Sequence, residues 1–487
     1  MATFLSSLAQ SQLFNFACVP LLLLQCSLVH PSYEADPSAR VLRLLLLPVV
    51  VVLAIGTQSR KLFLPLEEYL CVNYGLVAVP TFHICCLAIQ FAFHRGPALK
   101  ETPSEPSKRE GVVQEVRTKP PVVLQSTGSC MEPQNTPNFS RREVSRFGNQ
   151  KQYSTKLKDD LHSSNSPTVA ELIKFSIGIV ASPRGLAYAW APPARCLSRV
   201  PRKPIGEFLR DQVIEILIKN HIIFLVLCVY LLPAANNPQG AAGWISERLG
   251  FGRSRALDII VNQLTAAAFT FAAICAFNII GAVCTVAELL FITLARLVLP
   301  DDLRPEPFDT SLFPPLFNKL GSRDTLSGFW GEGWQCVFRR DFVFCGGLPM
   351  AKIGCWIFGP ESTLLFTLMG SMLLSGILVS GVLTITQPDF KFSTTKLFVM
   401  QGVGIVLERM LNLRKVLGGR AMRPLRYVVT YLWMTYWSQD MFEILYDRGL
   451  GRSGIIEADF RRWYWFQYFI PLGPFLPKGF INCLNVA

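Results

Sequence analysis

The sequence predicts an all-α fold, a polytopic bundle of about seven to nine transmembrane helices. Of its 487 residues, 51% are hydrophobic and only 17% are charged, whereas a soluble domain carries about a quarter charged residues. The apolar residues also lie in long uninterrupted runs, and about 20 such residues suffice to cross a bilayer. These observations exclude a soluble enzyme, a nucleic-acid-binding domain and a disordered protein.

Each candidate span is an apolar run between more polar segments. In chain order the runs are residues 13–29, 41–57, 71–93, 221–233, 264–294, 364–385, 396–410 and 427–437. The run at 264–294 is long enough for one tilted helix or for a tight helical pair, and the sequence leaves both open.

The positions of these runs divide the chain into three regions. Residues 1–93 hold the first three spans, and residues 220–487 form a second transmembrane region. Between them, residues 94–219 form a basic hydrophilic loop with 20 Lys and Arg against 12 Asp and Glu. Residues 97–167 are rich in Pro, Ser, Gln and Asn, so the first part of the loop is expected to be flexible. Juxtamembrane Lys and Arg explain the net charge of +13 without a nucleic-acid partner.

A second hydrophilic stretch, residues 296–360, is predicted to be an aromatic-rich loop within the second transmembrane region. We expect it to pack against the bundle or to lie in the membrane interface, because a solvated loop would not carry so much ring area. Trp330, Trp334 and Phe338 are spaced i, i+4 and i+8, which predicts that their rings share one helix face. This face is either an interfacial anchor or a wall for a flat, apolar acceptor.

Residues 313–317 read FPPLF, and residues 326–335 read LSGFWGEGWQ. This pattern resembles the signature of the wax-synthase-like membrane acyltransferases, in which WPPLFG is followed by SLRxFWGRxWHQ and a basic residue. Phe313 stands at the position of the family's first Trp, and the basic end is present.

Three further elements follow the order of that family. Residues 183–190 (PRGLAYAW) are similar to the RGIGW element of its fungal branch, and residues 378–384 (LVSGVLT) to its FxxSGxxH span. Residues 398–402 (FVMQG), running on to Glu408, resemble the helix that comes next. The resemblance implies a membrane enzyme that acylates or acetylates a secondary metabolite such as a terpenoid.

Both family histidines are replaced. The WHQ histidine falls at Gln335 and the SGxxH histidine at Thr384, and the chain has five histidines, none of them beyond His221. An imidazole that removes the hydroxyl proton accelerates such a reaction about 10²–10⁴-fold. Gln335 and Thr384 can orient the hydroxyl and polarise the thioester carbonyl, but neither holds a proton near neutral pH. Another group must take the proton.

Three residues are candidates for that role. Glu408 lies in an apolar run, where an intramembrane carboxylate is a functional hypothesis. The alternative for Glu408 is an ion pair with Arg409 or Arg414. Glu288 follows the same logic, with the alternative that it faces another helix. His221 opens a span, where it lines the cavity or lies at the interface.

Arg184, Arg339 and Arg340 are candidates to bind the phosphates of CoA, although charges that flank spans are expected in any membrane protein. The Ser-Gly pairs at 375–376 and 380–381 are explained by close helix packing. The 14 cysteines lack the spacing of a zinc site. We therefore expect no bound metal or cofactor.

The leading hypothesis is a membrane-embedded acyl-CoA-dependent O-acyltransferase of the endoplasmic reticulum that esterifies a lipophilic acceptor entering from the bilayer. Its predicted catalytic residues are Gln335, Thr384 and Glu408, and its predicted substrate-binding residues are Trp330, Trp334, Arg184, Arg339 and Arg340. Two alternatives stay open. One is an isoprenoid cyclase on the same scaffold, in which Glu408 is the acid and ring faces stabilise the cation. The other is a non-catalytic membrane partner of a pathway's enzymes.

Overall fold

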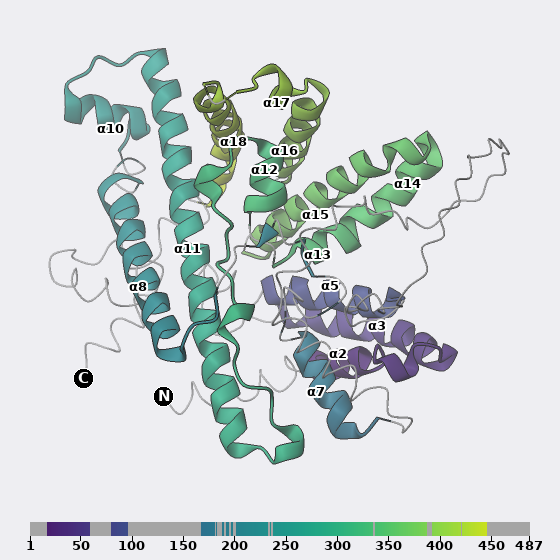
Figure 1. Ribbon diagram of the computed structural model, residues 1–487. Coiled ribbons are helices and arrows are strands. Elements are labelled where there is room, and N and C mark those ends of the chain that lie inside the picture. Colours follow the sequence, from purple (N-terminus) through teal and green to yellow (C-terminus); the bar gives the residue numbers. More distant parts are fainter. Residues whose placement is uncertain are drawn as a thin grey trace, which may run out of the picture.

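The computed structural model describes most of the chain outside the basic loop and the two ends. The described residues are 17–58, 79–95, 167–180, 182, 188, 191–193, 196–197, 201–231, 234, 237–334, 337–386, 392–419 and 421–445. Their regular structure is helical, with no strand among them, so the predicted all-α class is confirmed (Figure 1). Most of the predicted basic loop lies outside the described residues.

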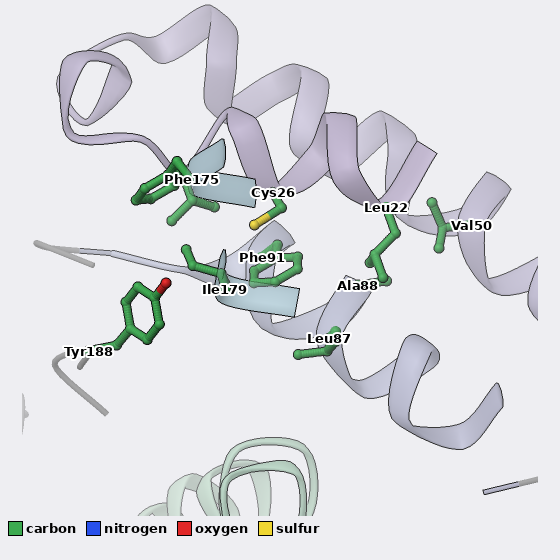
Figure 2. Packing of buried hydrophobic residues seen from close by; sticks show 10 residues of the cluster. Leu22, Cys26, Val50, Leu87, Ala88, Phe91, Phe175, Ile179 and Tyr188 are labelled. Atoms are coloured by element: carbon green, nitrogen blue, oxygen red, sulfur yellow. The ribbon is translucent and has the colours of Figure 1, made fainter. Parts of the chain in front are cut away.

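Four helices from the N-terminal part of the chain pack into one group. They are α2 (Cys18–Ser27), α3 (Pro37–Gln58), α5 (Val79–Phe93) and α7 (Val169–Val180). Figure 2 shows the side chains that fill the space between them. The buried members of this core are Leu22, Cys26, Val29, Val50, Leu87, Ala88, Phe91, Phe175, Ile179 and Tyr188. Helix α7, which lies within the predicted basic loop 94–219, therefore packs against the first spans.

A second group is a long antiparallel hairpin. Helix α8 (Ile205–Phe224) continues into the π-helical segment η5 (Leu225–Leu231), and after α10 (Gly240–Leu249) the chain returns along α11 (Arg255–Val298). Helices α8 and α11 lie side by side (Figure 1). Their contact is apolar and includes the buried Ile223, Phe269 and Ile279.

Helix α11 resolves the alternative that the sequence leaves open at 264–294. It is one continuous helix of 44 residues and not a helical pair. Ser254 caps its start, because the Ser254 hydroxyl accepts the backbone N–H of Leu257 at 3.2 Å. At 1.5 Å per residue the helix is about 66 Å long.

The C-terminal group contains α14 (Leu348–Phe358), α15 (Thr363–Thr386), α16 (Ser393–Met410) and α18 (Arg423–Leu445). The prediction of a loop at residues 296–360 is wrong for the second half of that stretch, which is helical. Helix α13 (Arg339–Asp341), the π-helical segment η10 (Phe342–Gly347) and α14 together form a helical run that is apolar enough to cross a membrane. The glycines that suggest a loop, Gly346, Gly347 and Gly354, serve close helix packing here.

Close helix packing explains the glycines of this group. A Cβ on Gly346 would lie 2.5 Å from the carbonyl oxygen of Gly370, and one on Gly376 would lie 2.6 Å from the Cα of Thr395. Beside the second contact, the hydroxyls of Ser380 and Thr395 lie 2.7 Å apart. The approach at Gly376 agrees with the packing role predicted for the first Ser-Gly pair, whereas a Cβ on Gly381 in the second pair would meet nothing within 4 Å.

Four helical segments among the described residues are long and apolar enough to cross a membrane: Pro37–Gly56, Arg255–Val298, Arg339–Phe358 and Pro360–Gly381. Two shorter apolar helices, Cys18–Ser27 and Val79–Phe93, accompany them. The predicted spans at 396–410 and 427–437 are helices, α16 and α18, but are not among the four. A membrane protein is supported, and the count of seven to nine spans stays a prediction.

Candidate functional site

The segment that follows the FPPLF motif begins as a short helix. Helix α12 (Leu326–Gly328) continues into the π-helical turn η9 (Phe329–Gly333), and the chain becomes extended at Trp334, with φ −65° and ψ 154°. Because the helix ends before Trp334, the prediction that Trp330, Trp334 and Phe338 share one helix face is wrong. We refer to residues 326–334 as the aromatic segment.

The bend nevertheless brings the two tryptophans together. Their ring centroids lie 5.0 Å apart, and Phe317 lies 5.0 Å from Trp334. Phe277 on α11 contacts Trp334 at 6.3 Å, and Phe398 on α16 contacts Trp330 at 5.8 Å. The aromatic segment therefore forms a ring cluster that joins the long hairpin to the C-terminal group.

Glu408 anchors the aromatic segment to α16. The carboxylate is 8% exposed. Its Oε1 accepts the hydroxyl of Ser327 at 2.8 Å, and its Oε2 accepts the Ser327 backbone N–H at 3.1 Å. An N–H in the first turn of a helix has no partner within that helix, so the carboxylate supplies one. Arg409 is exposed, and among the described residues Glu408 forms no ion pair with it, while the side chain of Arg414 is not described.

A second polar contact lies on the same face of α16. The Nε1 of Trp330 donates to the Oε1 of Gln401 at 3.4 Å, and Gln401 is fully buried. Gln401 and Glu408 are seven residues apart, which is about two helical turns. Between them, a Cβ on Gly404 would lie 2.6 Å from the Cδ1 of Leu326. The same Cβ would lie 2.5 Å from Nε1 of Trp433 on α18, so Gly404 lets α16 lie close to both α18 and the aromatic segment.

The other predicted site residues have different outcomes. Arg339 Nη1 donates to the carbonyl oxygen of Gly331 at 3.0 Å, so this guanidinium braces the aromatic segment. Arg340 is half-buried in the next helical run. Arg184 lies outside the described residues, and the binding of CoA phosphates by the three arginines stays a prediction.

The positions of the two replaced histidines are only partly described. Gln335 lies outside the described residues. Thr384 lies on α15, but its side chain is not described. The positions of these two side chains relative to Glu408 therefore lie outside the described part of the structure, and the shared catalytic role of Gln335, Thr384 and Glu408 stays a prediction.

A buried polar cluster forms around Asp341, seven residues beyond the aromatic segment. The Asp341 carboxylate is buried, with its residue 1% exposed. Asp341 Oδ2 lies 2.6 Å from Nδ1 of His83, and Asp341 Oδ1 accepts Nε2 of Gln90 at 2.6 Å. An ionised carboxylate only accepts hydrogen bonds, so Nδ1 of a neutral His83 carries the proton and Nε2 keeps its lone pair. That Nε2 is buried and has no hydrogen-bond partner among the residues that the structure describes.

This cluster belongs to a packed interface between α5 and the run α13–η10. His83 and Gln90 are two turns apart on α5 and lie on one side of it. The ring of His83 meets the ring of Phe338 edge-on at 5.7 Å, and Cys345 donates to the carbonyl oxygen of Cys86 at 3.7 Å. The interface connects the N-terminal group to the region that carries the family resemblance.

The two remaining candidates for proton removal lie elsewhere. Glu288 is half-buried on α11, and His221 is exposed in the last turn of α8. The exposure of His221 agrees with its interfacial interpretation. Among the described residues, no group of three His, Cys, Asp or Glu side chains is placed to hold a metal ion.

Sequence reasoning missed His83, Asp341 and Gln401. Asp341 directly follows the two arginines of the motif, and Gln401 lies inside the FVMQG element. Their positions in these motifs could therefore have marked both as candidate site residues. His83 had none, because no sequence pattern shows that α5 packs against a helix about 250 residues further on.

The model of the membrane bound O-acyl transferase family matches residues 313–400. This range contains the FPPLF motif, the aromatic segment and Asp341, and it ends one residue before Gln401 and eight residues before Glu408. A search of curated proteins and a search of solved structures gave no significant match. The family match supports a membrane-bound O-acyltransferase.

Proposed function

We propose that this protein is a polytopic acyltransferase of the endoplasmic reticulum that esterifies a hydroxyl of a lipophilic secondary metabolite, such as a terpenoid. Acetyl-CoA, or another short acyl-CoA, is the donor. One observation carries the proposal: the family match at 313–400 coincides with the segment that Glu408, Gln401 and Arg339 hold in place. A fixed segment of this kind suits a reaction that depends on positioning.

The aromatic segment supplies the acceptor site in this proposal. Trp330 and Trp334 are half-buried and lie against each other. Tryptophan offers a large apolar surface with one polar N–H, and the N–H of Trp330 is already directed to Gln401. The ring faces therefore suit a flat, apolar acceptor that arrives through the bilayer.

The donor site is proposed to lie beside the same segment. Arg339 and Arg340 begin the helical run 339–358. A guanidinium binds a phosphate oxygen pair through two parallel N–H groups, which suits the phosphates of CoA. The acyl thioester would then lie next to the acceptor, with Gln335 and Thr384 proposed to orient the reacting groups.

The experiment that tests this proposal is a product assay. Microsomes that contain the protein are given acetyl-CoA labelled in the acetyl group, together with a panel of lipophilic alcohols. Label in an ester, absent from microsomes without the protein, is the expected result. A mass-neutral product from an isoprenoid would instead indicate a cyclase. No conversion by well-accumulated protein would indicate a non-catalytic partner.

A matched pair of tryptophan variants tests the acceptor site. Trp334→Ala is expected to raise the KM for the alcohol about tenfold or more, because a buried aromatic contact is lost. Trp356→Ala is the control, because Trp356 is 86% exposed on α14. Equal effects of the two substitutions would contradict the placing of the acceptor at the aromatic segment.

A further inference from the structure

We propose that His83, oriented by Asp341, is the general base that removes the proton from the acceptor hydroxyl. The inference rests on the proposed acyltransferase function and names the group that replaces the two missing family histidines. The imidazole would come from α5, in the N-terminal group, and not from the region that resembles the family.

The first argument is the state of the imidazole. Asp341 Oδ2 lies 2.6 Å from Nδ1 of His83, and Gln90 donates to Oδ1 from the other side, so the carboxylate cannot easily rotate away. The carboxylate holds His83 in the tautomer that leaves Nε2 free to accept a proton. A buried carboxylate has the same role in the Ser-His-Asp triad, where it orients the imidazole and stabilises its protonated form.

The second argument is the unused nitrogen. Nε2 of His83 is buried and has no hydrogen-bond partner within the described part of the chain. A buried polar atom without a partner loses its hydrogen bonds to water and gains none in return, which destabilises the fold. A purely structural tie between α5 and Asp341 gains nothing from this cost, because an asparagine could make the same bond. A general base, in contrast, requires an unpartnered nitrogen, because its lone pair must be able to accept the proton of a hydroxyl.

The third argument is position. The ring of His83 touches Phe338, and Phe338 is three residues beyond Gln335, where the family carries its WHQ histidine. The next residue, Arg339, bonds the carbonyl oxygen of Gly331 in the aromatic segment. Packing of α5 thus places an imidazole against Phe338, which follows the position of the missing family histidine by three residues in the sequence.

The competing group is less free to act. Both carboxylate oxygens of Glu408 accept hydrogen bonds from Ser327. Each oxygen keeps a second lone pair, but a Glu408 side chain that moved to meet the acceptor hydroxyl would release Ser327, and the aromatic segment would lose part of its anchor. Glu408 is better placed to position the segment, while His83 carries the proton.

The step balances as follows. The acceptor oxygen attacks the thioester carbon while its proton moves to Nε2 of His83, and the positive charge that forms is stabilised by Asp341. The C–S bond then breaks, and the CoA sulfur leaves with the proton from Nε2. The products are the ester and free CoA, and His83 returns to its starting state.

The test uses two conservative variants of the full-length protein in microsomes. In His83→Asn, the amide nitrogen can still donate to Asp341 from about the position of Nδ1, but no group can accept a proton. In Asp341→Asn, the side chain retains one good acceptor for two donors, which favours the wrong tautomer of His83. His94→Asn, just beyond the end of α5, is the matched histidine control.

Both conservative variants are expected to lose about 10²-fold or more in kcat, with the KM for acyl-CoA and the amount and thermal midpoint of the protein unchanged. The control is expected to keep the wild-type rate. A kcat for His83→Asn within twofold of wild type would overturn the inference and leave the acyltransferase function standing. A fall in activity that only follows a fall in protein amount, in both variants, would also overturn it, because the pair would then be structural. Absence of ester formation by the wild type would overturn the function itself.

Discussion

The carboxylate of Glu408 binds Ser327 twice, through the hydroxyl at 2.8 Å and through the backbone N–H at 3.1 Å. The two residues are 81 positions apart in the chain. Ser327 is the second residue of the aromatic segment, and Glu408 lies near the end of α16. One buried side chain thus fixes the start of the segment to which the function is assigned.

The variant Glu408→Gln is expected to abolish turnover while the protein still accumulates in the membrane. Glutamine can place its oxygen at the backbone N–H and its N–H₂ at the Ser327 hydroxyl, but it is uncharged, so both contacts are weaker than those of the carboxylate. Ester formation and the amount of membrane protein are the measurements. Full activity would remove Glu408 from the mechanism.

The variant Ser327→Ala separates two roles of Glu408. Alanine removes the hydroxyl and keeps the backbone N–H bond, so we expect a loss of about 1–3 kcal/mol in stability and a partial loss of turnover. If turnover falls along with the stability that the lost hydroxyl bond contributed, Glu408 acts by positioning the aromatic segment. Unchanged turnover in Ser327→Ala, beside an inactive Glu408→Gln, would show that Glu408 acts directly.

Gly346→Ala is expected to destabilise the protein by about 1–3 kcal/mol, because overpacking moves well-packed backbones apart. The new Cβ would lie 2.5 Å from the carbonyl oxygen of Gly370 on α15. Gly381→Ala is the control, since a Cβ there meets nothing within 4 Å. Thermal unfolding of both variants in detergent is the measurement, and equal midpoints would contradict the close approach of η10 and α15.

Thr310→Val is expected to destabilise the protein more than Thr310→Ser. The buried hydroxyl of Thr310 accepts the backbone N–H of Lys203 at 2.9 Å and donates to its carbonyl oxygen at 3.0 Å. Valine leaves both backbone groups without this partner, at about 1–3 kcal/mol, whereas serine loses only a methyl group. The reverse order of thermal midpoints would show that packing outweighs the two bonds.

The pair Lys203–Asp211 predicts a small dependence of stability on pH. The hydrogen bond from Lys203, at 2.6 Å, lowers the pKa of Asp211, and the same bond raises the pKa of Lys203. The contribution of Asp211 is therefore lost as pH falls through its lowered pKa, and that of Lys203 is lost as pH rises through its raised pKa. The thermal midpoints of wild type and Asp211→Asn should differ near neutrality and converge in acid. A constant difference at all pH values would contradict this assignment.

The parts of the fold that depend on local sequence could be predicted. Apolar runs alone locate α3, α5, α11 and α15, because hydrocarbon thickness sets the length of a span. The limits lie where tertiary contacts decide the structure. The helical run 339–358 looks like a loop in sequence because its glycines serve contacts such as Gly346 with Gly370.

The same limit applies to the candidate site. Glu408 could be selected because an isolated carboxylate in an apolar run needs a reason, but its partner Ser327 could not. The i, i+4, i+8 spacing of the aromatic rings failed because a π-helical turn ends before Trp334. His83 meets Asp341 across 258 residues, a distance over which no periodicity in the sequence carries information.

The length of α11 implies that a single crossing of the membrane would place its two flanking segments on opposite sides. At about 66 Å it exceeds roughly 30 Å of hydrocarbon by more than half its length, so a single crossing leaves several turns protruding into water. A helix that crosses once delivers its two ends to different compartments. Residues 237–254 would then face one compartment and residues 299–312 the other. A glycosylation sequon inserted before Ser254 and one inserted after Pro300 could not both be glycosylated in the lumen.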